Sequence, residues 1–190
     1  RIQKAADAAA YADLDSDYDQ FEAMWLRASG LFSGRELGGQ ACFEPNATLS
    51  RGEFLVMAMQ VAGLAPDAVE TVSGFSDEGD APAWMRPYLS AALRCGVVSG
   101  IPASDGLLFA PNQPVTCAQA AVMLQNILQL PQPETATVFA PETILPTWAA
   151  SAVSTLAAAD LQLDCADYDR SLTRREAACL LYQAHLLHEA

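Results

Sequence analysis

Basic residues are scarce in this chain of 190 residues, which has 10 Lys and Arg against 23 Asp and Glu and a formal net charge of -13. Proteins that bind nucleic acids or anionic membranes nonspecifically rely on clustered Lys and Arg, so this charge balance argues against both kinds of partner. The chain also lacks an apolar run of about 18 residues, which a membrane-spanning helix needs, so we expect no membrane insertion.

Signatures of metal sites and disulfide frameworks are missing as well. The five cysteines are odd in number and have no C-x-x-C spacing, so we expect mostly reduced or buried thiols. Around the two histidines, His185 and His188, no Cys or carboxylate completes a metal ligand set. An EF-hand beginning at Asp13 fails because Tyr18 and Met24 occupy its Gly and Glu positions. We therefore predict no metal and no other cofactor.

The chain is apolar enough to form a core, with 52% hydrophobic residues. Residues 84–95 and 120–128 carry apolar side chains at helical spacing, and Trp84 begins the first of these stripes while Cys95 ends it. Between them, residues 100–114 predict a loop with room for a short strand or turn. Each unit is therefore predicted to be helix, loop, helix, and such units must pack together to bury their stripes.

A repeat runs along the chain. Gly30-x-x-x-Gly34 matches Gly96-x-x-x-Gly100, and in both copies Phe-x-Pro-Asn and then a four-residue motif follow, Ser50-Arg-Gly-Glu53 in the first copy and Thr116-Cys-Ala-Gln119 in the second. The second copy lies 66 residues after the first throughout this stretch. A third copy aligns Phe75 with Phe139 and Trp84 with Trp148 at an offset of 64, then loses seven residues. We predict a lead-in over 1–10 and units over 11–64, 75–130 and 139–187, packed as one compact module.

Each unit contains a capping box at the start of its later helix. These boxes are Ser50 with Glu53, Thr116 with Gln119, and Thr173 with Glu176. The box does not explain Arg51 and Arg174, because a cation in the first helical turn opposes the helix dipole. Packing or a ligand must favour these two arginines.

The motif order resembles the S-layer homology (SLH) repeat: Phe-x-Asp, an aromatic helix, Gly-x-x-x-Gly, Phe-x-Pro-Asn, then Ser/Thr-Arg-x-Glu. Three such copies imply a mainly α pseudo-threefold trimer around a central three-helix bundle. They also imply a non-catalytic module that anchors a larger surface protein to the wall of a Gram-positive bacterium. Its ligand would be a secondary cell-wall polysaccharide, including pyruvylated polymers, held in grooves between repeats.

The resemblance also implies site residues. The family's ligand-binding arginine maps onto Arg51 and Arg174, and its groove glycines map onto Gly34 and Gly100. An arginine fork suits a ketal carboxylate, and free amides at a helix N-terminus would lie beside it. We also assign Asp77 and Trp84 to glycan binding, although a tryptophan at the start of an amphipathic helix is more often part of the core.

The second and third repeats depart from the family pattern. Cys117 stands in place of the arginine in the second repeat, and Asp160 and Asp164 replace the glycine pair in the third. In the third repeat Phe-x-Asp has also become Phe139-Ala140-Pro141. We expect one competent groove at Arg51, a weaker one at Arg174, and a third without function.

Two alternatives remain open. A degenerate repeat trimer without glycan binding would be a structural or protein-interaction domain, and an Arg51 held in an internal ion pair would favour it. A glycan hydrolase would need two carboxylates flanking a cleft, but Glu53 and Glu176 are explained by capping. We expect a monomer.

Overall fold

The computed structural model describes residues 10–14, 17–67, 72–133, 139–161, 163 and 165–189. Within these residues the chain forms six α-helices and two short β-hairpins. The prediction of a mainly α fold is confirmed. Among the described helices, none combines the length and the apolar character that crossing a membrane requires.

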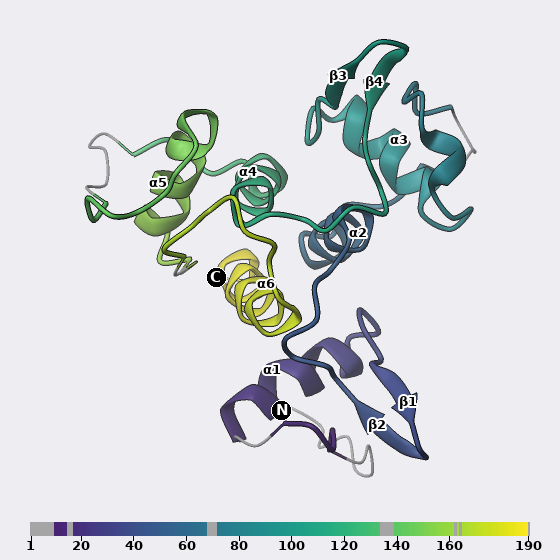
Figure 1. Ribbon diagram of the computed structural model, residues 1–190, viewed down its shortest axis with the longest axis vertical. Coiled ribbons are helices and arrows are strands. Elements are labelled where there is room, and N and C mark those ends of the chain that lie inside the picture. Colours follow the sequence, from purple (N-terminus) through teal and green to yellow (C-terminus); the bar gives the residue numbers. More distant parts are fainter. Residues whose placement is uncertain are drawn as a thin grey trace.

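Three helices lie together at the centre, where Figure 1 shows them nearly end-on: α2 (Arg51–Val61), α4 (Cys117–Leu128) and α6 (Arg174–His188). Helix α2 packs against both of the others. It is buried almost all round, with Phe54, Leu55 and Met59 among its most buried side chains. A helix that is apolar on every face is stable only where neighbours surround it, which explains the central position of α2.

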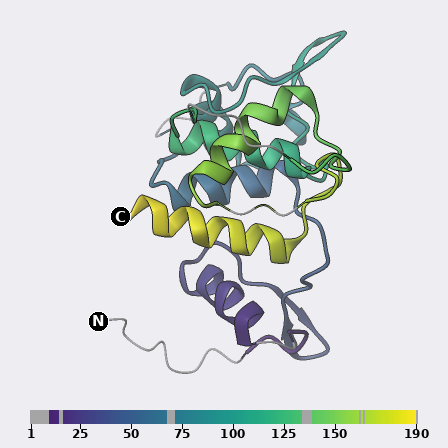
Figure 2. The same ribbon diagram turned by 90° about the vertical axis from the view of Figure 1, so that its left-hand side faces the viewer.

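Three outer lobes surround these helices. Lobe 1 (residues 10–43) holds α1 (Asp17–Ala28), and lobe 2 (residues 72–109) holds η1 (Glu78–Asp80) and α3 (Arg86–Arg94). Lobe 3 (residues 139–172) holds η2 (Thr147–Ala149) and α5 (Ala150–Ala158). The outer helices pack on central helices in the pairs α1 with α6, α3 with α2, and α5 with α4. Figure 2 shows α6 lying between lobe 1 and the rest of the molecule.

Two antiparallel hairpins occupy segments predicted to be mainly loop. In lobe 1, β1 (Arg35–Leu37) pairs with β2 (Gln40–Cys42), and in lobe 2, β3 (Ile101–Ala103) pairs with β4 (Gly106–Leu108). The turn of the first hairpin is Gly38-Gly39, and both glycines have positive φ angles of 60° and 81°. A two-residue turn of this kind matches the twist of the strands and favours glycine at both positions.

The predicted apolar stripe over 84–95 is wrong at both ends. Helix α3 begins only at Arg86, with Pro87 in its first turn, and Trp84 lies before the helix with 55% of its surface exposed. Cys95 lies just after the helix and is exposed. Proline in the first turn fixes the helix start, because its ring has a helical φ and the missing N–H is not needed there.

All three central helices begin with a complete capping box. The Ser50 Oγ, Thr116 Oγ1 and Thr173 Oγ1 atoms accept from the backbone three residues on, and Glu53, Gln119 and Glu176 accept from the cap residue's own N–H. The hydroxyl acceptors lie 3.2, 3.2 and 3.3 Å from these backbone nitrogens. Each helix start therefore has two of its orphan donors satisfied by side chains.

The next donors of each helix start are satisfied by backbone carbonyls of another segment. Arg51 N–H donates to Gln113 O, Cys117 N–H to Arg170 O, and Arg174 N–H to Ala47 O, over 2.8, 3.0 and 2.8 Å. The residue that follows each of them donates to the carbonyl two residues earlier, at Pro111, Tyr168 and Pro45. These bonds form a closed ring in which each helix start is held by the next segment round the centre.

Candidate functional site

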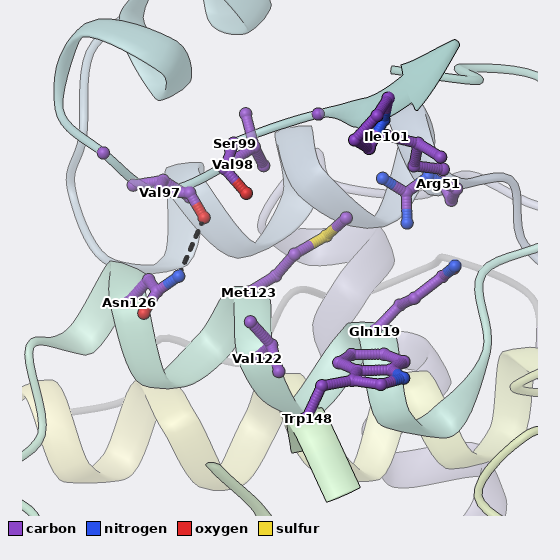
Figure 3. A pocket seen from close by; sticks show the side chains of 13 residues that line it. Arg51, Val97, Val98, Ser99, Ile101, Gln119, Val122, Met123, Asn126 and Trp148 are labelled. Carbon is purple, nitrogen blue, oxygen red and sulfur yellow. Dashed lines mark hydrogen bonds between the residues drawn. The ribbon is translucent and has the colours of Figure 1, made fainter. Parts of the chain in front are cut away.

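A cavity of about 520 Å³ opens beside the start of α2 (Figure 3). One wall is the segment 96–102, which leads from α3 into β3, and another is the face of α4 that carries Gln119 and Asn126. Arg51 of α2 and Trp148 of η2 complete the lining, together with Val122 and Met123 of α4. The cavity is thus built by lobe 2, two central helices and lobe 3.

Arg51 is the only cation in this lining, and its side chain is held firmly. The residue is 6% exposed, its Nε donates to Phe109 O over 2.9 Å, and its guanidinium lies over the Phe109 ring at 5.1 Å from the centroid. No acceptor among the described residues lies within hydrogen-bond distance of Nη1 or Nη2. These contacts are the packing that favours an arginine in the first helical turn.

Burial lowers the pKa of Arg51, and Asp77 partly opposes this shift. A guanidinium nevertheless stays protonated at any physiological pH. No carboxylate of the described residues forms an ion pair with it, so a nearly buried positive charge remains without a direct counterion. Such a group favours an anion that can reach its two η nitrogens.

The remaining lining is largely apolar, and its polar and aromatic groups are two side-chain amides, the Ser99 hydroxyl and the indole of Trp148. Asn126 Nδ2 donates to Val97 O over 3.1 Å, which ties α4 to the opposite wall (Figure 3). Trp148 is 60% exposed at the cavity, near Gln119 in Figure 3. A cation, neutral amides and an exposed indole together suit a polar ring compound that carries an anionic group.

Free amides at the helix N-terminus were expected beside the arginine, and this expectation is wrong. The amide of Arg51 donates to Gln113 O, that of Gly52 to Pro111 O over 3.0 Å, and that of Glu53 to Ser50 Oγ. The inter-segment ring and the capping box occupy these donors. A ligand in this cavity would meet the arginine side chain rather than the helix amides.

Arg174 occupies the same helix position in α6 but has a partner. Its Nη1 donates to Glu44 Oε2 over 2.7 Å and to Phe43 O over 3.1 Å, and its guanidinium lies over the Phe32 ring at 5.0 Å. Its side chain is 13% exposed, and its Nε is buried without an acceptor among the described residues. Glu44 thus neutralises the charge of Arg174, whereas the charge of Arg51 has no such partner.

A second cavity, of about 500 Å³, is the counterpart of the first in lobe 1. It is lined by the segment 30–33, by α2 residues that include Glu53, and by Trp84 and Tyr88 of lobe 2. Glu53 stands where the first cavity has the neutral Gln119, and Arg174 is absent from the lining. Anions are therefore disfavoured here relative to the first cavity.

Gly34 and Gly100 are required by packing inside their own lobes. Both have positive φ angles, of 74° and 77°, and a Cβ on Gly34 would lie 2.5 Å from Tyr11 Cε1. A Cβ on Gly100 would lie 2.8 Å from Phe75 Cε1. Gly100 also lines the first cavity, whereas Gly34 is absent from the linings of both cavities.

Asp77 is engaged by the backbone. Its two carboxylate oxygens accept from the Phe109 and Ala110 amides over 2.9 and 2.6 Å, and Asp13 accepts in the same way from Phe43 and Glu44. The carboxylate therefore fixes the strand end that supplies the Phe109 carbonyl to Arg51. It positions the arginine's partner and does not line the cavity.

The start of α4 differs from those of α2 and α6, because its first turn holds no arginine. Cys117 replaces the arginine, and Arg170 of lobe 3 pairs with Glu176 through Nη1–Oε2 and Nη2–Oε1 distances of 3.0 and 2.5 Å. Asp160 has a φ of 58°, the left-handed conformation that Gly30 and Gly96 adopt at the ends of α1 and α3. Asp164 lies outside the described residues.

Trp148 and Asn126 line the main cavity and were not assigned to the site from sequence, and Gln119 was assigned only a capping role. Trp84 and Trp148 are both exposed, so the core position that is more usual for a tryptophan at the start of an amphipathic helix does not apply to either. The signal for Trp148 was present in its alignment with Trp84. The sequence does not specify which neighbouring lobe each tryptophan faces, and this decides which cavity it lines.

Comparison with curated proteins finds no match to this chain. A family model does match part of it, over residues 74–121, which form lobe 2, the connection to α4 and the start of that helix. That model describes the S-layer homology domain, whose members are non-catalytic and generally anchor proteins to cell-wall polymers at the bacterial surface. The segment 74–121, which supplies one wall of the Arg51 cavity, therefore carries the signature of an S-layer homology domain.

Proposed function

We propose that this chain is a non-catalytic anchoring module that binds an anionic secondary cell-wall polysaccharide in the Arg51 cavity. On this proposal the units 11–64, 75–130 and 139–187 are three tandem SLH repeats, the second and third of them degenerate, arranged with pseudo-threefold symmetry. The match at 74–121 and the equivalent capping boxes support this organisation.

One observation carries the choice of site. Arg51, in the first turn of α2, lines a cavity, and its two η nitrogens have no acceptor among the described residues. A pyruvate ketal carries a carboxylate that both η nitrogens can bind, and the exposed face of Trp148 can stack on the adjoining sugar ring. Gly100 and Gln119 complete the ligand contacts that we propose.

The location follows from the ligand. We propose that the module lies outside the cell on a Gram-positive wall, as a monomeric part of a larger surface protein. Because both chain and polymer are anionic, binding depends on the local charge of Arg51 against a repulsive background.

The test is co-sedimentation with purified wall sacculi, with and without their secondary polymer. Arg51→Gln removes the charge while leaving an amide that can still donate, and we expect affinity to fall roughly 10- to 100-fold, the value of a charged hydrogen bond. Trp148→Ala should also weaken binding. Polymer-dependent binding that is unchanged in a folded Arg51→Gln variant would refute the site.

Two matched variants serve as controls. Arg174→Gln changes the same helix position, but the charge it removes is already paired with Glu44. Trp84→Ala changes the equivalent tryptophan at the cavity that contains Glu53. We expect both to retain binding, and loss of binding in Trp84→Ala alone would move the site to the second cavity.

A structural or protein-interaction module is the second candidate. The ion pair of Arg174 and the replacement of an arginine by Cys117 favour it, because two of the three helix starts lack a free cation. Failure of the wild-type chain to bind any wall that carries the polymer would support this alternative.

A further inference from the structure

Two cysteines that are distant in the sequence lie side by side at the start of α4. Cys117 Sγ, at the beginning of α4, lies 2.7 Å from Cys165 Sγ in lobe 3, and the two residues are 0% and 6% exposed. A disulfide bond is about 2.05 Å long, so a movement of less than about 1 Å brings the sulfurs to bonding distance. The other cysteines, Cys42, Cys95 and Cys179, make no contact of this kind with one another or with this pair.

The position of this pair gives it a structural meaning. At the other two helix starts, Arg51 donates to Phe109 O of lobe 2 and Arg174 donates to Phe43 O of lobe 1. Each arginine thus fastens a central helix to a lobe. At the start of α4, the side chain in the same position is that of Cys117, and its sulfur makes the contact with lobe 3.

We propose that Cys117 and Cys165 are a covalent modification site, oxidised to a disulfide that fastens α4 to lobe 3 where the other helix starts use arginine. This inference goes beyond wall anchoring and does not depend on it. The bond replaces a polar contact by a cross-link between residues 48 positions apart in sequence.

The chemistry is thiol–disulfide exchange with a low-molecular-weight disulfide as oxidant. When local opening between α4 and lobe 3 exposes the buried sulfur, the Cys117 thiolate attacks one sulfur of the oxidant, forming a mixed disulfide and releasing one thiolate. The Cys165 thiolate then attacks the Cys117 sulfur and releases the second. Two protein thiols lose two protons and two electrons, and the oxidant is reduced to two thiols.

The surroundings favour the thiolate of Cys117 over that of Cys165. The hydrogen bond to Cys117 and burial raise the pKa of Cys165 well above its ordinary value, and Arg170, whose Nη2 lies 3.3 Å from Cys165 Sγ, offsets only part of this rise. Once Cys117 is held in the mixed disulfide it no longer carries a charge, and Arg170 then favours ionisation of Cys165. Hydrogen bonding from Cys165 lowers the pKa of Cys117, against the effect of burial. Glu176 keeps Arg170 in place through its two-point ion pair.

The experiment counts thiols in the denatured 190-residue chain after incubation with oxidised or reduced glutathione. Of the five cysteines, we expect three free thiols in the oxidised sample and five in the reduced sample. A protease that cuts before Asp isolates Cys117 from Cys95 and Cys165, because Asp105 and Asp160 lie between them. The Cys117 and Cys165 peptides should stay joined until reduction.

Variants make the assignment specific. Cys117→Ala should abolish the cross-link, while the matched control Cys95→Ala, at an exposed cysteine, should retain it. Oxidation should raise the Tm of the wild-type chain by roughly 5 to 15 °C, and this rise should be absent in Cys117→Ala. Five free thiols after oxidation, or a link that joins Cys95 to another cysteine, would overturn the proposal.

Discussion

Gly52→Ala in α2 is expected to destabilise the protein, although alanine is the better helix former. A Cβ at this position would lie 2.3 Å from Met85 Sδ, 2.4 Å from Met85 Cε and 3.1 Å from Pro111 O. Met85 is 2% exposed and Pro111 O accepts the Gly52 amide, so the new methyl group enters a space that is already filled at the junction with lobe 2.

Two opposing effects decide the magnitude. Replacing glycine by alanine within a helix gains about 0.5 to 1 kcal/mol, while forcing an extra methyl group into a packed core costs about 1 to 3 kcal/mol. The closest contacts are with the far end of the Met85 side chain, which can rotate away within its buried site, whereas Pro111 O at 3.1 Å is backbone and must shift slightly, so the cost lies near the middle of that range. The net loss is about 0.5 to 1.5 kcal/mol, or a fall in Tm of about 1 to 6 °C for a domain of this size.

The assay is thermal unfolding followed by circular dichroism. The reciprocal control is Ala118→Gly, at the same position of α4, where the native Cβ is fully buried. We expect this variant to be destabilised too, by about 1 kcal/mol or more, because it loses helix preference and buried surface together. A Tm for Gly52→Ala equal to or above that of the wild-type chain would refute the packing argument.

Two further predictions concern the helix starts. Ser50→Ala should lower stability by about 1 kcal/mol, because the Glu53 amide loses its acceptor, and a chemical denaturation midpoint equal to that of the wild-type chain would contradict this. Burial alone would raise the pKa of Glu176, but hydrogen bonds from Arg170 and Thr173 hold it below its ordinary value. A lowered folded pKa means stability that is present above the unfolded pKa, about 4.3, and is lost as pH falls through the folded pKa. Glu176→Gln, which keeps the type of capping box seen at Gln119, should therefore lose less stability between pH 6 and pH 3 than the wild-type chain, as measured by Tm at the two values, and an equal loss would point to other carboxylates.

Local features of this fold were predictable because they depend on short stretches of chain. A hydroxyl followed three residues later by Glu or Gln specifies a capping box, and Ser50 with Glu53 forms one. Gly38-Gly39 specifies a hairpin turn in the same way, although the strands beside it are too short to show a periodic pattern. The start of α3 was misplaced because apolar spacing received more weight than Pro87.

The site itself depends on contacts across the chain, which sequence alone does not specify. Arg51 was identified from its conflict with the helix dipole, but its partner Phe109 is 58 residues away. The same conflict marks Arg174, whose Nη1 donates to Glu44, a residue 130 positions away in the sequence. The sequence around each arginine does not show which of the two guanidinium groups is paired with a carboxylate.

The ring of hydrogen bonds at the helix starts has a consequence for the number of units in the fold. In a solenoid each unit contacts only its neighbours, so units can be added at the ends and the terminal units need special caps. Here the last hydrogen bond, from Arg174 N–H to Ala47 O, returns to the first segment. Each of the three central helices therefore has its first amide paired with a carbonyl of another segment, and none of them lies at an open end. Closure therefore limits the assembly to three members: a fourth would find no unpaired carbonyls to accept its amides, and removal of one would open two junctions at once.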